Sequence, residues 1–364
     1  MARRVLVCLS GGVDSTVAAF LLKQQGYDVA GITFWLWSSP GTPDRAGESK
    51  CCSLDAATTA AREIGIPHEI VDASDGFRRL VIDDFVDRTL RGETPNPCGR
   101  CNRYVRFGLA LDYAEHHGYD RVATGHHVRC RREADGIVSL RTGVDPDKDQ
   151  TYFLYGLTQF ELDRLLFPVG EMTKRKVYAV ARAHALTCAE RPESQDLCFA
   201  AAGQTSFLFP QADVRPGPIL DPTGRRIGTH EGLPRYTIGQ RRGLGVPSGR
   251  PLYVIEIDPR RNVLVVGEED LLFGSELDAI DANYLAGTAP AEGARLSVKI
   301  RYRSPAAEAT VFPRSGGRFH VAFDAPQRAI TPGQLAVLYD GDRLLGGGTI
   351  ARAGSDTQHP FPPV

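Results

Sequence analysis

The sequence VLVCLSGGVDSTVAAFLL, Val5–Leu22, joins the end of a short apolar run to the start of a helical pattern through Ser-Gly-Gly-Val-Asp-Ser. A strand–turn–helix of this kind places unpaired backbone N–H groups and the positive end of a helix dipole at the turn. The glycines let an anion approach the backbone, and the serine hydroxyls add donors. The stretch therefore predicts a phosphate-binding turn, and a plain tight turn capped by Asp14 is the alternative.

Strand and helix patterns alternate through the first two hundred residues. The strand patterns are RVLVCLS, DVAGITFWLW, HEIVDAS and YDRVATGHH, and the helical patterns cover 14–26, 53–67, 75–92 and 105–118. Strands separated by helices of this length predict an α/β domain with a doubly wound parallel sheet. Ligands of such sheets bind at the carboxyl ends of the strands, where both the opening turn and ATGHH lie.

The residue composition and the predicted secondary structure change near residue 202. Prolines and glycines become dense in VRPGPILDPTGRRIGTHEGLP, and short β-rich segments follow with hairpin signals such as Asp340–Gly341. We therefore predict a small β-rich domain followed by a β-barrel or sandwich.

Composition limits the class of protein. The chain has 364 residues, of which 42% are hydrophobic and 24% charged, which is ordinary for a globular protein of two or three domains. Its apolar runs are too short for a membrane helix or a signal peptide, so we expect a cytoplasmic protein with no membrane partner. The net charge of −1 excludes a bulk polycation. Any basic face for nucleic acid would have to come from the arginine clusters at 129–132, 225–226, 241–242 and 301–303.

Cysteines supply the second chemical signal. The eight cysteines are Cys8, Cys51, Cys52, Cys98, Cys101, Cys130, Cys188 and Cys198. In a cytosolic chain the C-x-x-C formed by Cys98 and Cys101 predicts a metal-binding or catalytic pair rather than a structural disulfide. We interpret the thiols of Cys8, Cys130 and Cys188 as packing groups and assign no role to Cys51 and Cys52.

The turn Ser10–Ser15 lacks the lysine of a G-x-x-x-x-G-K-[ST] loop and has the pattern S-G-G-x-D-S. In this it resembles the PP-loop enzymes, or N-type ATP pyrophosphatases, which split ATP into AMP and pyrophosphate while adenylating a substrate. The resemblance implies that Ser10–Ser15 bind the pyrophosphate part of ATP. It also implies that Asp14 helps to position Mg²⁺, a hard cation that prefers oxygen ligands.

Further segments resemble the tRNA-specific 2-thiouridylases of bacteria, in the order of that family and from Val5 to about Ile350. They are TPNPCGRCNRYVRFG (94–108), ATGHH (123–127), DKDQTYFLYGL (147–157), LFPVGEMTK (166–174), SQDLCF (194–199), TIGQRRGLG (237–245), KIRYR (299–303) and TPGQLAVLYDGDRLLGGGTI (331–350). The resemblance implies a PP-loop domain over 1–202, a central tRNA-contacting domain over 203–274 and a C-terminal β-barrel over 275–357.

The implied reaction is ATP-dependent thiolation of C2 of the wobble uridine, position 34, in tRNAs for Lys, Glu and Gln. Adenylation turns the C2 oxygen into a leaving group, and a sulfur nucleophile then expels AMP. The resemblance assigns the persulfide to Cys198 and the attacking thiolate to Cys101. A sulfur-donor protein, either a cysteine desulfurase or a relay protein, would load the persulfide. The alternative for Cys198 is a buried, unreactive side chain.

The resemblance also implies a set of binding residues. Those for ATP are Cys8, Leu9, Ser10, Gly11, Gly12, Val13, Asp14, Ser15, Phe34 and Gly125. Those facing the target base are Asn96, Pro97 and Cys98. Those contacting tRNA are His126, Lys148, Asp149, Gln150, Arg301, Tyr302 and Gln334. Two of them have plainer explanations, since His126 could be a hydrogen-bonded histidine at the sheet edge and Asn96 could cap a turn.

Cys98 departs from the family pattern, because relatives carry an aspartate at that position. A third thiol opens an alternative, in which Cys98, Cys101 and Cys198 hold a [4Fe–4S] cluster whose free iron binds the sulfide. We favour the persulfide relay because the other motifs follow the bacterial family. Two rival functions stay open. One is a PP-loop ligase that adenylates a small metabolite and needs no cysteine, and the other is a non-catalytic metal-binding RNA module that needs no ATP.

Overall fold

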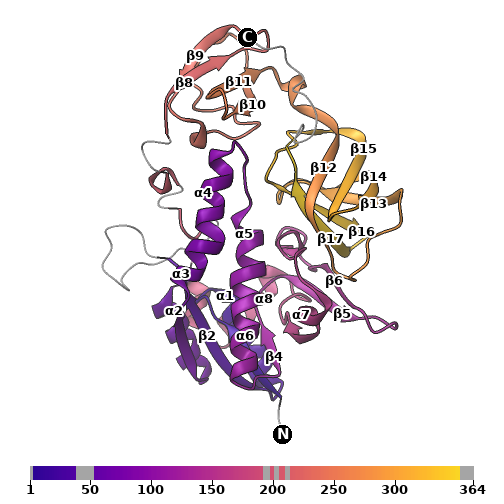
Figure 1. The fold of residues 1–364 in the computed structure, drawn as a ribbon. Coiled ribbons are helices and arrows are strands. Elements are labelled where there is room, and N and C mark those ends of the chain that lie inside the picture. Colours follow the sequence, from indigo (N-terminus) through magenta and orange to yellow (C-terminus); the bar gives the residue numbers. More distant parts are fainter. Residues whose placement is uncertain (1–2, 38–52, 192–196, 201–204, 210–213, 353–364) are drawn as a thin grey trace.

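The computed structural model describes residues 3–37, 53–191, 197–200, 205–209 and 214–352. Its strands form three sheets, in an N-terminal α/β part, a small central part and a C-terminal barrel (Figure 1). Cys51, Cys52, residues 194–196 of the SQDLCF motif and the predicted boundary residues 202, 203 and 357 lie outside the described residues. None of the helices in these ranges combines the length and hydropathy needed to cross a bilayer.

The first sheet has five parallel strands, which confirms the predicted α/β fold class. Their order is β3 (His68–Asp72), β2 (Asp28–Trp35), β1 (Arg4–Cys8), β4 (Arg121–Ala123) and β7 (Leu165–Leu166). From β1 the chain adds β2 and β3 on one side of β1, and then adds β4 and β7 on the opposite side. The strand order therefore reverses between β1 and β4, and the carboxyl ends of these two strands border the crevice where such sheets bind ligands.

Successive residues of β1 face opposite sides of the sheet, and each side is covered by helices. Val5 and Val7 pack in the apolar cluster that contains α1 (Val13–Gln24), α2 (Leu54–Ile64) and α8 (Lys174–Ala183). Leu6 packs in a second cluster, with Phe77 and with Leu111 of α6 (Gly108–His116). A strand buried on both faces reads as a continuous apolar run, as VLVCL does.

Two long helical segments rise from this sheet toward the central part (Figure 1). One consists of α3 (Ser74–Phe77), the π-helical turn η1 (Arg78–Ile82) and α4 (Asp83–Leu90), and it confirms the helix predicted over 75–92. The other consists of α5 (Pro97–Arg100), the π-helical turn η2 (Cys101–Phe107) and α6. This helix begins eight residues before the predicted 105–118, because the Asn96 side chain accepts from Gly99 N at 3.1 Å and Pro97 occupies the first turn. The C-x-x-C motif is therefore helical.

The C-terminal sheet is a closed barrel, as the resemblance implied. Its order is β12 (Phe273–Tyr284), β15 (Arg318–Arg328), β14 (Ala307–Arg314), β13 (Ala294–Lys299), β16 (Leu335–Asp340) and β17 (Arg343–Ile350), and β17 pairs back with β12. The hairpin of β5 (Val128–Arg132) and β6 (Val138–Thr142) extends this sheet from the N-terminal part through β17. Arg129 and Arg141 both pair with Asp342 of the barrel, so Arg129 of one predicted basic cluster serves a contact between parts of the chain.

The central sheet has the order β10 (Tyr253–Asp258), β11 (Val263–Gly267), β8 (Gly217–Leu220) and β9 (Arg226–His230). Its core contains Ile219, Val254 and Leu264, each fully buried. The remaining helical turns are η3 (Thr151–Phe153), α7 (Gln159–Arg164), η4 (Thr187–Glu190), η5 (Ser206–Leu208), η7 (Leu233–Arg235) and η8 (Glu269–Leu272).

Candidate nucleotide and sulfur site

The opening turn has the backbone of an anion-binding turn. Gly11 has φ +77°, and a Cβ at this position would lie 2.4 Å from the Ala56 Cβ, so only glycine fits. Gly12 is the N-cap of α1, and no side chain caps this helix. The hydroxyls of Ser10 and Ser15 lie 3.1 Å apart beside the turn. The alternative in which Asp14 caps the helix is wrong, because Asp14 lies in the first turn and bonds elsewhere.

Asp14 joins two other segments at this turn. Its Oδ2 accepts from Lys174 Nζ at 2.6 Å, and its Oδ1 lies 3.0 Å from His127 Nε2. Burial alone would raise the pKa of Asp14, but the hydrogen bond from His127 and the charge of Lys174 outweigh it and lower the pKa below its ordinary value. Within the described ranges, the buried Nδ1 of His127 has no hydrogen-bond partner. The turn therefore holds an ionised carboxylate next to a nearly buried ammonium group.

Lys174 is the residue that the sequence analysis missed. It starts α8, its backbone N–H donates to Asp145, and its side chain is only 11% exposed. Lys174 is the last residue of the segment LFPVGEMTK, 166–174, so the sequence did point to it. A lysine at this position is, however, also typical of the beginning of an ordinary amphipathic helix. A desolvated ammonium group beside a turn predicted to bind phosphate can neutralise phosphate charge.

Gly125 brings the end of β4 against the opening turn. A Cβ on Gly125 would lie 2.5 Å from Ser15 N, so the two strand ends meet as the strand order predicts. Cys8 lies at the end of β1, and burial raises the pKa of its thiol to about 12, which keeps it protonated. The Phe34 side chain is 7% exposed and packs in the cluster that contains α6, on the opposite side of the sheet from α1.

His126 is buried, with 5% exposure. Its Nδ1 lies 2.8 Å from Thr124 Oγ1, and its ring lies 5.6 Å from that of Phe107. Burial, together with the charge of Arg106, lowers the pKa of His126 to about 3, so the ring is neutral at ordinary pH. This placement has the features of the hydrogen-bonded sheet-edge histidine given above as the plainer explanation.

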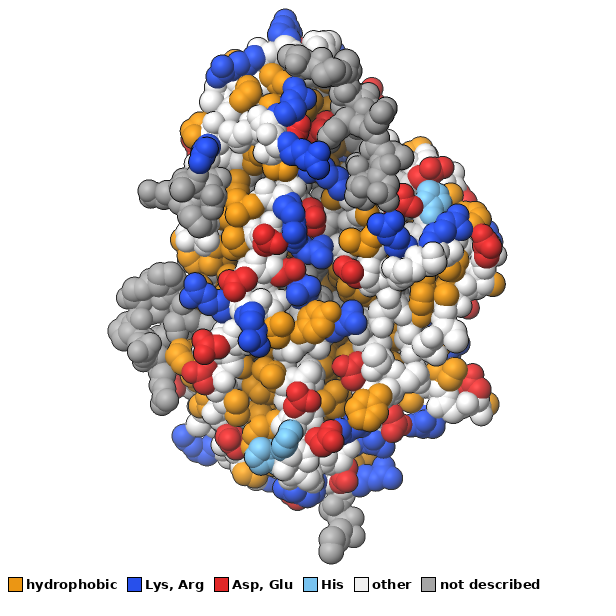
Figure 2. Space-filling model, in the orientation of Figure 1, with side chains coloured by type: hydrophobic (Ala, Val, Ile, Leu, Met, Phe, Trp, Pro, Cys, Tyr) orange, Lys and Arg blue, Asp and Glu red, His pale blue; other side chains and the backbone are white. Residues whose placement is uncertain are grey.

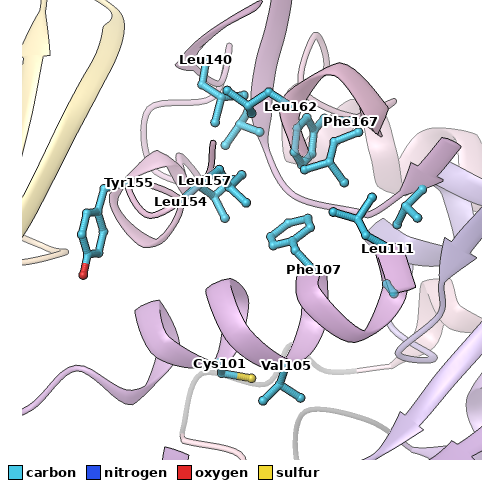
Figure 3. Close-up of a cluster of buried hydrophobic side chains, with 14 of the residues drawn as sticks. Cys101, Val105, Phe107, Leu111, Leu140, Leu154, Tyr155, Leu157, Leu162 and Phe167 are labelled. Atoms are coloured by element: carbon cyan, nitrogen blue, oxygen red, sulfur yellow. The ribbon is translucent and has the colours of Figure 1, made fainter. Parts of the chain in front are cut away.

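The two cysteines with predicted roles border one apolar cluster. Cys101 is 8% exposed and belongs to the cluster, and Cys198 packs against it. Figure 3 shows Cys101 and Val105 on one side of the helix, whereas Tyr155 lies beyond its other side. Next to Cys198, Phe199 is 2% exposed and its ring lies 5.3 Å from Phe85 of α4, which anchors the segment 197–200.

Cys98 is half-buried on α5, and the next residue, Gly99, lies against Leu335 of the barrel. It lies close enough to Tyr302 to raise the pKa of that phenol slightly, alongside the larger effects of burial and Asp149. The Tyr302 ring lies 4.5 Å from Phe153 of η3, which follows Lys148, Asp149 and Gln150 in the chain. The structure therefore brings one residue predicted to face the base and one group of residues predicted to contact tRNA into the same neighbourhood.

Three of the predicted tRNA-contacting side chains already serve the fold. Asp149 is buried and accepts from Thr151 Oγ1 at 2.7 Å, and Gln150 Oε1 accepts from the His127 backbone at 2.9 Å. Arg301 donates to Ala329 O at 3.0 Å and to Ile238 O at 3.2 Å, in the seam between the barrel and the central sheet.

Gln334 holds the barrel against the loop that carries Asn96. Its Nε2 donates to Thr94 O at 2.7 Å, and Thr94 N donates to Pro332 O at 2.8 Å. Between them, Gly333 has φ +89°, and a Cβ there would lie 3.0 Å from Thr94 N. The two loops are therefore in backbone contact, and the barrel supports the start of α5.

Comparison with known proteins agrees with this architecture. Residues 3–202 match the model described as tRNA methyl transferase HUP domain, residues 205–268 the tRNA methyl transferase PRC-barrel domain, and residues 275–350 the aminomethyltransferase beta-barrel domain. The tRNA-specific 2-thiouridylase MnmA of Moorella thermoacetica is 46% identical, over 95% of this chain and 98% of that protein. MnmA of Chloroflexus aggregans is also 46% identical, over 96% and 98%.

This chain belongs to the tRNA-specific 2-thiouridylase family. The family resemblance drawn from the motifs is therefore confirmed. A solved 4-thiouridine synthetase–RNA complex with bound ATP is 19% identical over 52% of this chain and 43% of that chain, with a TM-score of 0.33, a likeness too low to support an argument.

Proposed function

We propose that this 2-thiouridylase family member is an ATP-dependent tRNA sulfurtransferase. It adenylates and then thiolates C2 of the wobble uridine of tRNAs for Lys, Glu and Gln, and releases pyrophosphate and AMP. The observation that carries the proposal is the combination, in one chain, of a glycine-rich turn before an uncapped helix N-terminus at the carboxyl edge of the sheet and two cysteines at one apolar cluster. We place the reaction in the cytoplasm.

In the first step, the backbone N–H groups of Ser10–Ser15 would hold the pyrophosphate part of ATP. Lys174 would neutralise charge on the leaving pyrophosphate, since its ammonium group lies beside the turn. Asp14 fits a role as a Mg²⁺ ligand, because Mg²⁺ binds through one or two carboxylates together with substrate phosphates. When bound, Mg²⁺ would add to the neutralisation of the phosphate charge.

In the second step, a donor protein such as a cysteine desulfurase or a relay protein loads Cys198 as a persulfide. The terminal sulfur attacks C2, a C–S bond forms, and the bond between C2 and the AMP oxygen breaks. The Cys101 thiolate then attacks Cys198 Sγ, which breaks the S–S bond, releases 2-thiouridine and leaves a Cys101–Cys198 disulfide. Two electrons from an external dithiol restore both thiols. In the alternative order, Cys101 attacks the persulfide first and frees hydrosulfide.

An iron–sulfur route is the second candidate for the sulfur step. It requires Cys98, Cys101 and Cys198 to bind one cluster. Among the residues that the structure describes, no three Cys, His, Asp or Glu side chains are grouped closely enough to hold a metal ion. We therefore derive no step through a cluster. Purification without oxygen and measurement of bound iron distinguish the two routes, because an iron-free and fully active enzyme excludes the cluster.

The test of the proposed function uses the full chain, an unmodified tRNA transcript whose anticodon begins with uridine, ATP and a persulfide source. We expect tRNA-dependent pyrophosphate release and 2-thiouridine at the wobble position by mass spectrometry. The absence of both would contradict the proposal. A Cys198→Ser variant that keeps full ATP turnover without tRNA would favour a small-metabolite ligase instead.

A further inference from the structure

A cavity of about 290 Å³ opens on the side of α5 that faces away from Cys101. It lies between α4, α5 and the barrel, and the α5–η2 residues that line it are Asn96, Gly99, Arg100, Arg103 and Tyr104. Spacings of three and four residues put these side chains on one helix face, whereas Cys98, Cys101 and Val105 share another. Tyr155, which lines the cavity, lies across the helix from Cys101 in Figure 3. The cavity therefore lies on a different helix face from Cys98 and Cys101, and it shares Asn96 with the residues predicted to face the target base.

Two of the three arginines that line the cavity are neutralised by acids. Arg88 lies 3.3 Å from Asp84, 3.1 Å from Glu93 and 3.6 Å from Asp281. Arg100 lies 3.2 Å from Asp84 and donates to Leu80 O at 2.9 Å. Arg88 and Arg100 therefore cannot bind a further anion without breaking these existing contacts.

Arg103 differs from the other two. Within the part of the chain that the structure describes, its guanidinium has no recorded ion pair or hydrogen bond, and it lies 5.1 Å from the centre of the Tyr104 ring. Its stem lies against Gly156, where an added Cβ would come within 2.8 Å of Arg103 Cδ. Three arginines line the cavity, and Arg103 is the one that has no acidic partner among the described residues.

Tyr104 is 39% exposed at the same cavity. The Arg100 and Arg103 guanidinium groups each lie 5.1 Å from its ring centre. An exposed aromatic ring beside a positioned arginine is the arrangement that binds single-stranded nucleic acid, because a base stacks on the ring and a phosphate contacts the cation. Figure 2 shows basic side chains gathered over α4 and α5 with acidic ones among them, a pattern that fits one phosphate better than a continuous track.

We propose that this cavity binds one nucleotide of the tRNA next to the reacting uridine, with its base on Tyr104 and its phosphate at Arg103. The proposal rests on the proposed function and adds a second RNA subsite to it. The physical reason is that turning the target base out of the anticodon stack leaves its neighbour unstacked. Asn96 begins the helix that bears both sites, so the neighbouring nucleotide is within reach when the target base approaches Cys98.

The test measures the Kd of an unmodified tRNA transcript at several salt concentrations. We expect Arg103→Ala to raise the Kd about tenfold near 0.15 M salt and to lower the slope of log Kd against log salt by about 0.7, the value for one single-strand phosphate contact. Tyr104→Ala should raise the Kd about tenfold with no change in slope, since stacking releases no counterions. Tyr104→Phe should bind like the parent.

Arg182→Ala is the matched control, because Arg182 is an exposed arginine 5.6 Å from the ring of Tyr178 on α8, outside the cavity. It should leave the Kd and the salt slope unchanged. Arg103→Gln keeps a stem on Gly156 while removing the charge, so it repeats the test if Arg103→Ala fails to fold. Thermal unfolding of each variant checks for folding.

The outcomes separate the subsite from the proposed function. If the Arg103 and Tyr104 variants bind tRNA like the parent while the parent makes 2-thiouridine, the subsite is overturned and the function stands. If these variants bind tRNA normally but accept sulfur more slowly from a donor protein, the cavity contacts that protein and the RNA assignment is wrong. A parent enzyme that makes no 2-thiouridine overturns the proposed function itself.

Discussion

The phosphate half and the sulfur half of the candidate site are held together in different ways. Ser10–Ser15 are consecutive, and their geometry follows from one positive φ at Gly11 and the start of α1. Cys101 and Cys198 are far apart in the chain and are placed by packing, through Val105 on one segment and Phe199 on the other. The proposed anion binding therefore depends on local backbone geometry, whereas the proposed sulfur chemistry depends on a tertiary contact.

The largest effect is expected from Cys198→Ser, which disrupts the sulfur half and leaves the phosphate half intact. Cys198→Ser removes the proposed persulfide carrier, so formation of 2-thiouridine should fall at least about 10⁴-fold, because a serine hydroxyl does not carry transferable sulfur. Single-turnover pyrophosphate release should remain within about threefold of the parent, since the phosphate half is intact. Mass spectrometry and a pyrophosphate assay check the two readouts. Cys188→Ala, at a buried cysteine of the other cluster, is the control and should keep both activities.

Disrupting the phosphate half should instead reduce pyrophosphate release. Asp14→Ala removes the carboxylate that holds Lys174 and that fits Mg²⁺, so pyrophosphate release should fall about 10³-fold. Binding of tRNA should stay within about twofold, because Asp14 does not line the cavity described above. Asp28→Ala changes an exposed aspartate at the start of β2 and should have no effect. Pyrophosphate release at the parental rate in Asp14→Ala would refute the assignment of the turn.

Lys174 tests whether the phosphate half extends beyond the opening motif. Lys174→Met keeps an apolar stem of similar length but removes the cation, so we expect an approximately 10²-fold loss of pyrophosphate release with a raised KM for ATP. Steady-state kinetics with varied ATP measure both. Lys176→Met, at an exposed lysine two residues along α8, provides the control. An unchanged KM and kcat would make the Lys174–Asp14 ion pair purely structural.

A substitution at Gln334 tests whether the contact between the barrel and the loop before α5 supports the sulfur half. If it mainly supports the loop at Thr94, Gln334→Ala should lower kcat about tenfold while the Kd for tRNA changes less than about twofold. A direct contact with tRNA, as the resemblance implies, would instead raise the Kd with little change in kcat. Gln334→Glu keeps an acceptor and length but loses the amide donor to Thr94 O, so it should resemble the alanine variant in the first case.

The last expected effect concerns stability at low pH rather than catalysis. Burial lowers the pKa of His126 to about 3 in the folded state, whereas an unfolded histidine titrates near 6.5. The neutral ring therefore contributes its full stability above about pH 6.5, and this contribution is lost as the pH falls toward 3, by at most about 1.4 kcal/mol per pH unit. Urea unfolding at several pH values should show a shallower dependence for His126→Gln. His116→Gln, at an exposed histidine, should match the parent.

Much of the fold was predictable because its signals are local. The buried β1 run, the helix over 75–92 and the glycine-rich turn all depend on neighbouring residues, and the structure confirms them. The early start of the second long helix was missed, since Pro95 and Pro97 read as a turn until the Asn96 cap is seen. The proposed roles of Lys174 and Arg103 were missed, because the role of a cation in a helix depends on which residues of other segments it faces. Arg301 illustrates the reverse, since an arginine in a basic motif donates to backbone carbonyls in a seam.

The amino-acid sequence by itself determined the parallel sheet, the glycine-rich turn before α1 and the family, because periodicity and contiguous motifs reflect interactions between residues close in the chain. Only the tertiary structure decided which charges are neutralised, which cysteines share a cluster, and that the barrel holds the loop before α5. These features depend on contacts between segments distant in sequence. The free energy of a buried charge or thiol is set by those neighbours in space, and they are not written next to it in the chain.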